Sequence, residues 1–112
     1  MALLVHTWDL PLSREELHWY ERRGGELVPT ILAQPGVLEC RAYRSPTGAS
    51  PQVMVEIELQ TMDDLRALLA SDEYRQVLGD MRSCRNVSVA VWDVSPLLPT
   101  SRRGETSGRP AP

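Results

Sequence analysis

His6 is the residue of this chain best suited to acid–base chemistry. Histidine titrates near neutral pH, so its imidazole can take a proton from a bound molecule or hold a substrate hydroxyl group. The residue lies in an N-terminal segment with the pattern of a strand, on the same parity as Leu4 and Trp8. Two interpretations are open: His6 is a general base in a ligand site, or it is a hydrogen-bonded residue in a subunit interface.

Six further side chains are candidates for ligand binding because they are aromatic or charged: Trp8, Tyr20, Arg41, Tyr43, Glu56 and Trp92. The two tryptophans could stack on a flat ligand, although aromatic rings on a sheet face also form the core of interfaces. Tyr20 falls on the apolar stripe of a predicted helix and could line a cavity beneath it. Arg41 and Glu56 lie on neighbouring predicted strands, where a cross-strand ion pair is the simplest interpretation.

The sequence shows no motif of the other common kinds of catalytic centre. No nucleophile–base pair, phosphate-binding loop, metal-ligand cluster or pair of catalytic carboxylates is visible as a motif. Cys40 and Cys84 do not form a metal-binding spacing such as C-x-x-C. We expect both thiols to be reduced, as is usual in the cytoplasm. The sequence therefore predicts a cytoplasmic protein without a metal or cofactor.

Length and composition limit the classes of protein that the chain can belong to. Its 112 residues suffice for one domain with one core. A net charge of −3 argues against nucleic acid as a partner, since nucleic acid binding requires a basic surface. No apolar run approaches the length that crosses a membrane. The chain thus has the composition of an ordinary globular domain.

The elements that must position these side chains follow from the periodicity of the apolar residues. Strands are predicted over residues 2–9, 37–44, 52–60 and 86–95, where side chains alternate between two kinds. Between the first two strands, Ser13 and Glu16 form a capping box that begins a helical segment. We expect a kink at Gly24-Gly25 and a restart of that helix at Pro29. A second helical segment follows Thr61, with a break at Ser71-Asp72.

One parity of each strand is mainly apolar and is predicted to face the helices. This set is Leu3, Val5, Thr7, Leu38, Cys40, Ala42, Val53, Val55, Ile57, Leu59, Val87, Val89 and Val91. The other parity mixes aromatic, polar and charged side chains, His6 among them, and is predicted to line the opposite sheet face. Exposed aromatic rings on that face would be unfavourable in water, so a second copy of the chain is expected to cover it.

The order β-α-β-β-α-β with right-handed crossovers predicts an α+β, ferredoxin-like fold. In this fold a four-stranded antiparallel sheet carries its helices on one face. The predicted domain covers residues 1–95. Residues 96–112 are polar and rich in Gly, Pro and Ser, so we expect a flexible tail.

Two stretches of the chain resemble a known group of proteins. The first is Gln34-Pro35-Gly36-Val37-Leu38, after the first helical segment. The second is the run from Glu56 to Leu65, continued from Leu68 to Tyr74. Both are similar to the antibiotic-biosynthesis-monooxygenase-like branch of the dimeric α+β barrel superfamily. The resemblance covers about residues 1–95 and implies a homodimer in which two sheets pack face to face, with a ligand cavity between sheet and helices in each subunit.

The activities that the resemblance implies are diverse. Some members are cofactor-independent monooxygenases of polycyclic aromatic substrates, while others degrade haem, isomerise small molecules or have no known activity. Active members commonly end the third strand with Trp, where this chain has Glu58-Leu59-Gln60. The His of the haem-degrading type is also missing from residues 75–79. We therefore expect a homodimer that binds a hydrophobic or aromatic small molecule, as a cofactor-free monooxygenase, as a non-catalytic binding or structural dimer, or as an isomerase or cyclase.

Overall fold

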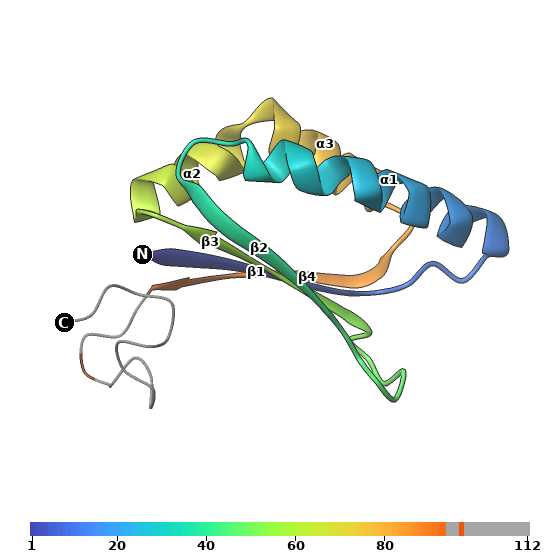
Figure 1. Ribbon diagram of the computed structural model, residues 1–112. Helices are drawn as coiled ribbons and strands as arrows, with labels where there is room; N and C mark the ends of the chain where they lie inside the picture. Colours follow the sequence, from blue (N-terminus) through green and yellow to red (C-terminus); the bar gives the residue numbers. More distant parts are fainter. Residues whose placement is uncertain (94–96, 98–112) are drawn as a thin grey trace.

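A four-stranded antiparallel sheet carries all its helices on one face (Figure 1). The computed structural model describes residues 1–93 and Leu97. The strands are β1 (Ala2–Asp9), β2 (Val37–Arg44), β3 (Val53–Leu59) and β4 (Arg85–Asp93), in the spatial order β2-β3-β1-β4. The helices are α1 (Arg14–Leu32), α2 (Met62–Ala70) and α3 (Asp72–Asp80). This is the predicted ferredoxin-like α+β arrangement. The predicted tail lies outside the described residues, apart from Leu97.

The ends of the helices follow the capping signals in the sequence. The Ser13 hydroxyl accepts a hydrogen bond from the Glu16 amide at 3.0 Å and begins α1. Ser71 ends α2 and begins α3, where its hydroxyl accepts from the Tyr74 amide at 3.1 Å. The predicted break between α2 and α3 is therefore confirmed. The predicted restart at Pro29 is wrong, because α1 runs as one helix from Arg14 to Leu32.

The two sides of β1 are the reverse of the prediction. Leu4 pairs with Ile57 and His6 pairs with Val55, so Leu4, His6 and Trp8 all lie beneath the helices. These three side chains are only 0%, 3% and 6% exposed. Alternation could not identify the buried side, since Leu3, Leu4 and Val5 make both parities apolar at the start of the strand. The prediction that His6 and Trp8 share an open sheet face with Trp92 is therefore wrong.

The other strands match the predicted sides, and Leu38 is the exception. Val55 and Ile57 of β3 face the helices, together with Cys40 of β2 opposite Ile57. Leu38 is 56% exposed, because the register of β2 shifts between Val37 and Glu39. Val89 of the edge strand β4 pairs with His6 on the helical side but stays 45% exposed. The helices thus cover the middle of the sheet more completely than its β4 edge.

A buried carboxylate fixes the end of β1 near the site. Asp9 accepts hydrogen bonds from the Ser50 hydroxyl at 2.6 Å, the Gln52 amide at 3.0 Å and the Asn86 side-chain amide at 2.7 Å. The Ser50 bond is the largest of the contributions that lower the pKa of Asp9. Asp9 therefore ties β1 to the loop before β3 and to the start of β4.

Candidate functional site

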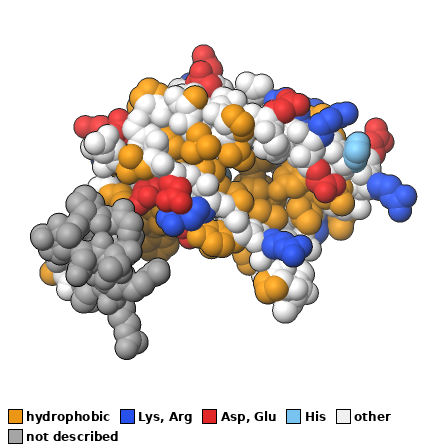
Figure 2. Space-filling view, viewed as in Figure 1, with side chains coloured by type: hydrophobic (Ala, Val, Ile, Leu, Met, Phe, Trp, Pro, Cys, Tyr) orange, Lys and Arg blue, Asp and Glu red, His pale blue; other side chains and the backbone are white. Residues whose placement is uncertain are grey.

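A cavity of about 230 Å³ lies between α1, α3 and the helical side of the sheet. It forms where two clusters of buried side chains meet, one around Leu4 and Leu59 and the other around Trp8 and Met81. Hydrophobic side chains gather around a hollow between the helices and the sheet (Figure 2). The apolar part of the wall consists of Leu27, Val28, Ile31 and Val77 from the helices, Met81 directly after α3, and Cys40, Ala42, Val53, Val55 and Ile57 from the strands.

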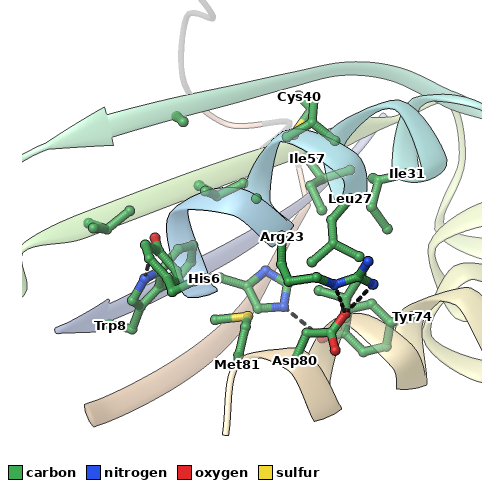
Figure 3. Close-up of a pocket in the computed structure, with 17 residues that line it drawn as sticks. His6, Trp8, Arg23, Leu27, Ile31, Cys40, Ile57, Tyr74, Asp80 and Met81 are labelled. Atoms are coloured by element: carbon green, nitrogen blue, oxygen red, sulfur yellow. Dashed lines mark hydrogen bonds and ion pairs between the residues drawn. The ribbon is translucent and has the colours of Figure 1, made fainter. Parts of the chain in front are cut away.

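His6 lies in the cavity wall and is hydrogen-bonded to Tyr74. The distance from His6 Nε2 to the Tyr74 hydroxyl oxygen is 2.7 Å, and the ring centroids are 5.6 Å apart (Figure 3). Burial holds the pKa of His6 below its ordinary value of 6.5 and raises the pKa of Tyr74. At neutral pH the pair is therefore an uncharged imidazole beside a protonated phenol.

The pair can move a proton in two ways, which depend on the His6 tautomer. When Nδ1 carries the ring proton, Tyr74 donates to Nε2, and a proton taken up at the phenol oxygen can pass to His6. When Nε2 carries the proton, it donates to Tyr74, and Nδ1 is the basic atom. In both arrangements an uncharged base lies in the wall of an apolar cavity.

Trp8 and Tyr20 form a second polar pair in the same wall. The Trp8 indole Nε1 donates to the Tyr20 hydroxyl at 3.0 Å, and the two rings meet edge to face with centroids 6.4 Å apart. Burial raises the pKa of Tyr20, so its hydroxyl stays protonated. Since that oxygen accepts from Trp8, its own proton can be donated to a ligand oxygen. The pair thus provides an aromatic surface and a hydrogen-bond donor.

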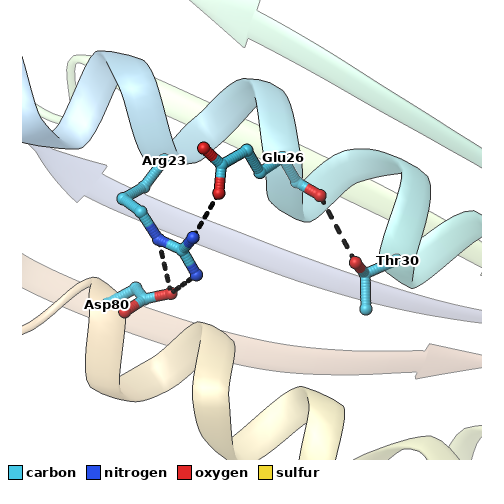
Figure 4. A network of polar contacts seen from close by, with 4 residues as sticks. All are labelled: Arg23, Glu26, Thr30 and Asp80. Carbon is cyan, nitrogen blue, oxygen red and sulfur yellow. Dashed lines mark hydrogen bonds and ion pairs between the residues drawn. The ribbon is translucent and has the colours of Figure 1, made fainter.

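An ion pair connects the two helices that cover the cavity. Arg23 of α1 reaches Asp80 of α3 through Nη2 at 2.8 Å and Nε at 3.2 Å, with both bonds to Oδ2 (Figure 4). Its Nη1 also contacts Glu26, one turn further along α1. The Arg23 and Asp80 side chains are 24% and 18% exposed, so the pair is largely withdrawn from solvent.

The seven residues predicted for the site divide between the two faces of the sheet. His6, Trp8 and Tyr20 line the cavity together. The remaining candidates are Arg41, Tyr43, Glu56 and Trp92, which are absent from the cavity wall. The strand register places all four on the face opposite His6.

On that open face, Arg41 forms an ion pair with a different residue than the predicted Glu56. The two residues are directly opposite in the β2–β3 register, as predicted. The ion pair of Arg41, however, is with Glu39 of the same strand, at 3.7 Å. Tyr43 and Trp92 are 43% and 59% exposed. These side chains therefore form a surface rather than part of the cavity.

Besides the apolar side chains given above, four residues of the cavity wall were not among the sequence candidates: Arg23, Gly24, Tyr74 and Asp80. In the sequence, Tyr74 was only the end of the second stretch that resembles a known family, and its hydrogen bond to His6 spans 68 residues of sequence. Gly24 was predicted only to be part of a kink in the first helical segment. A side chain placed there would meet nothing within 4 Å, so this glycine borders empty space. Only the tertiary structure brings these residues together.

The described residues hold no group of three or more His, Cys, Asp or Glu side chains arranged to bind a metal ion. Among the helices of that same part of the chain, none combines the length and the apolar character needed to span a bilayer.

Comparison with known proteins shows similarity of structure rather than of sequence. No model of a known protein family matches the chain, and no curated protein matches it in sequence. Among solved structures, a proposed antibiotic biosynthesis monooxygenase from Deinococcus radiodurans is similar with a TM-score of 0.68 and 11% identity. The similarity covers 88% of this chain and 96% of that one.

Two further solved structures have the same arrangement. SnoaB from Streptomyces nogalater, a cofactor-independent oxygenase, has a TM-score of 0.66 and 16% identity, covering 88% of this chain and 96% of its own. A dimeric protein of unknown function and ferredoxin-like fold from Bacteroides fragilis has a TM-score of 0.68 and 9% identity, covering 83% and 95%. At such identities the likeness shows a shared fold, and the fold predicted from the sequence resemblance is confirmed.

Proposed function

We propose that the chain binds an apolar, flat small molecule in the cavity between α1, α3 and the sheet. The observation that carries this proposal is the apolar cavity of about 230 Å³ with the His6–Tyr74 hydrogen bond in its wall. Ligand pockets typically combine apolar walls with a few placed polar groups. Drug-sized ligands occupy roughly 300–1,000 Å³, so this cavity suits a smaller ligand of a few rings.

Within this proposal, the chain is a cofactor-independent monooxygenase. An uncharged imidazole can remove a proton from a carbon activated by an adjacent aromatic ring and carbonyl group. The resulting carbanion reacts with dioxygen, and loss of water converts a methylene group to a carbonyl group. One oxygen atom of dioxygen enters the product and the other leaves as water. The similarity of fold to SnoaB supports this chemistry, since SnoaB is described as a cofactor-independent oxygenase.

The open face of the sheet supports a second part of the proposal, which is that the chain forms a homodimer. Tyr43 and Trp92 are exposed on that face, away from the cavity. Covering such aromatic surface with an identical copy is favourable, because a two-fold interface is self-complementary. The solved structure from Bacteroides fragilis is described as dimeric, which agrees with this arrangement. The cavity lies on the other side of the sheet from this surface.

Anthrone is a suitable test molecule, because its acidic methylene group becomes the second carbonyl of anthraquinone with one dioxygen consumed. We expect the wild-type protein to bind anthrone in a calorimetric titration and to accelerate its conversion. Replacing His6 with Gln should lower the rate by about 100-fold to 10,000-fold, the usual effect of losing a general base. His18→Gln, a change of an exposed histidine on α1, is the matched control and should leave the rate unchanged.

The alternatives predict different results in the same experiment. A non-catalytic binding dimer would bind anthrone without accelerating its oxidation in any variant. An isomerase or cyclase would bind without consuming oxygen, and its ligand would be found by mass spectrometry of molecules that co-purify with the protein. If the wild-type protein fails to bind anthrone and smaller aromatic molecules alike, the proposal of a ligand cavity is wrong.

A further inference from the structure

Arg23 and Asp80 are the two residues of the cavity wall that carry a charge at neutral pH. The other titratable residues of the wall are His6, Tyr20, Cys40 and Tyr74. Burial shifts the pKa of each of these toward the uncharged form. The charge that a ligand meets in this cavity is therefore decided by how Arg23 and Asp80 are arranged.

Asp80 occupies the edge of the Arg23 guanidinium that a bound carboxylate would use. Nε and Nη2 form one edge of the planar group, and both donate to Asp80 Oδ2. Two parallel donors of this kind are the usual binding site for a carboxylate ligand. The opposite side, at Nη1, contacts Glu26, whose side chain is 59% exposed. An anionic ligand thus finds this edge of Arg23 already neutralised.

The position of Asp80 within its own helix supports a role in this pairing. Asp80 is the last residue of α3, where the helix dipole carries partial negative charge and disfavours a carboxylate. The last turn of α3 holds no basic residue that would offset this effect. The ion pair with Arg23 is therefore the compensating interaction for the Asp80 carboxylate. Its consequence is a cavity wall with no unpaired cation.

We propose that Asp80 is a specificity-determining residue, which neutralises Arg23 and makes the cavity select uncharged ligands over carboxylates of the same shape. This inference rests on the proposed ligand cavity and defines the chemical class of its ligand. It also predicts how the preference changes: removing the Asp80 charge exposes a bidentate donor to the cavity, so the cavity then accepts a monocarboxylate.

Two probes of nearly equal shape test this inference: 2-naphthalenemethanol, which is neutral, and 2-naphthoate, which is anionic at pH 7.5. In a calorimetric titration, we expect the wild-type protein to bind the alcohol about tenfold or more tighter than 2-naphthoate. The carboxylate must give up its hydration in a cavity whose wall offers no unpaired cation. In Asp80→Asn, the affinity for 2-naphthoate should rise by about tenfold or more, as a charge-assisted hydrogen bond forms with Arg23. That gain should shrink as the salt concentration is raised.

The matched control is Asp72→Asn, which removes the same charge from the other end of α3. Asp72 is 92% exposed and pairs with Arg75 at 3.3 Å, away from the cavity wall. The affinities of Asp72→Asn for both probes should equal those of the wild-type protein. Arg23→Gln is the second test variant, because it leaves Asp80 as the only charge in the wall. This variant should bind 2-naphthoate no better than the wild-type protein does, and 2-naphthylmethylammonium at least about tenfold better.

The outcomes separate this inference from the proposed function. If the wild-type protein binds both probes equally, or if folded Asp80→Asn gains nothing for 2-naphthoate, Asp80 does not determine specificity although the cavity binds ligands. If Asp80→Asn does not fold, the result for Arg23→Gln decides, and no gain for the cationic probe overturns the inference. If neither probe binds to the wild-type protein, the ligand cavity itself is wrong and the inference fails with it.

Discussion

At the scale of single residues, the site is built from polar side chains that are buried in pairs. His6 has Tyr74, Trp8 has Tyr20, and Arg23 has Asp80. A buried polar group without a partner costs about 1–3 kcal/mol, so each pairing removes a penalty that would otherwise oppose folding. Each pair also joins β1 to a helix or joins two helices, which means that the groups facing the cavity are held in place.

The first prediction concerns the pH dependence of stability. Burial lowers the pKa of His6 in the folded state below the ordinary value of 6.5, so between these two values the unfolded chain binds more protons. The contribution of the uncharged His6 to the free energy of unfolding is therefore complete above pH 6.5, and it is lost as the pH falls below this value. We expect urea unfolding to show a lower free energy of unfolding at pH 5.5 than at pH 7.5.

Two variants assign this effect to His6. His6→Gln should lose most of the change between pH 7.5 and 5.5, because glutamine does not titrate. His18→Gln should keep the change, since His18 is an exposed residue of α1. Asp9 acts at lower pH, because its lowered pKa removes stability only as the pH falls below its ordinary value of 3.8. An identical slope in all three proteins would show that His6 is not the titrating group.

At the scale of the elements, α1 forms one wall of the cavity, and its glycines have different surroundings. Both residues of Gly24-Gly25 lie within a continuous helix, where each glycine costs about 1 kcal/mol relative to alanine. Gly24 borders the cavity, whereas Gly25 is exposed. A Cβ atom at either position would meet nothing within 4 Å. The space in front of Gly24 thus belongs to the cavity and is kept open by the missing side chain.

The second prediction compares alanine at these two neighbouring positions. Gly24→Ala and Gly25→Ala should each stabilise the protein by about 1 kcal/mol, because both improve the helix propensity of α1 equally. Only Gly24→Ala should weaken the binding of 2-naphthalenemethanol, since its methyl group enters the cavity. Gly24→Leu should abolish that binding while the fold is kept. Thermal melts and calorimetric titrations of the three variants measure both effects, and equal binding by Gly24→Leu and Gly25→Ala would contradict the position of the ligand.

At the scale of the whole molecule, the two faces of one sheet have different roles. The helical face holds the cavity, with His6 and Trp8 in its wall. The open face presents Trp92 and Tyr43, which we propose to meet a second copy of the chain. Because neighbouring residues of a strand point to opposite faces, a substitution in β4 or β2 can change the dimer without altering the cavity.

The third prediction tests this separation of roles. Light scattering of the wild-type protein at micromolar concentration should give about twice the chain mass of 12.6 kDa. Trp92→Asp should give the mass of a single chain, because a charge on the proposed interface opposes its burial. Leu78→Asp is the control, since Leu78 is an exposed apolar residue of α3 on the helical side. A monomeric wild-type protein, or equal effects of the two variants, would show that the open face is not the interface.

The arrangement of the elements could be derived from local patterns. Strand alternation, the Ser13 capping box and the Ser71 break each depend on residues within a few positions of one another. Local signals of this kind predicted the element order and the ferredoxin-like topology. The predicted restart of the helix at Pro29 was wrong for the complementary reason. Packing of α1 on the sheet, through residues such as Leu27 and Ile31, keeps one helix continuous past the two glycines and Pro29.

The sequence by itself determined that His6, Trp8 and Tyr20 were candidates for a site, because residue type and helical or strand parity are local properties. Only the tertiary structure decided which face of the sheet His6 belongs to. Both parities of β1 are apolar, so the choice depended on the Tyr74 and Tyr20 hydroxyl groups, which reach Nε2 of His6 and Nε1 of Trp8 from other elements. The Arg23–Asp80 pair spans 57 residues for the same reason. Partners that satisfy buried polar groups are close in space and distant in sequence, and only the packed chain brings them together.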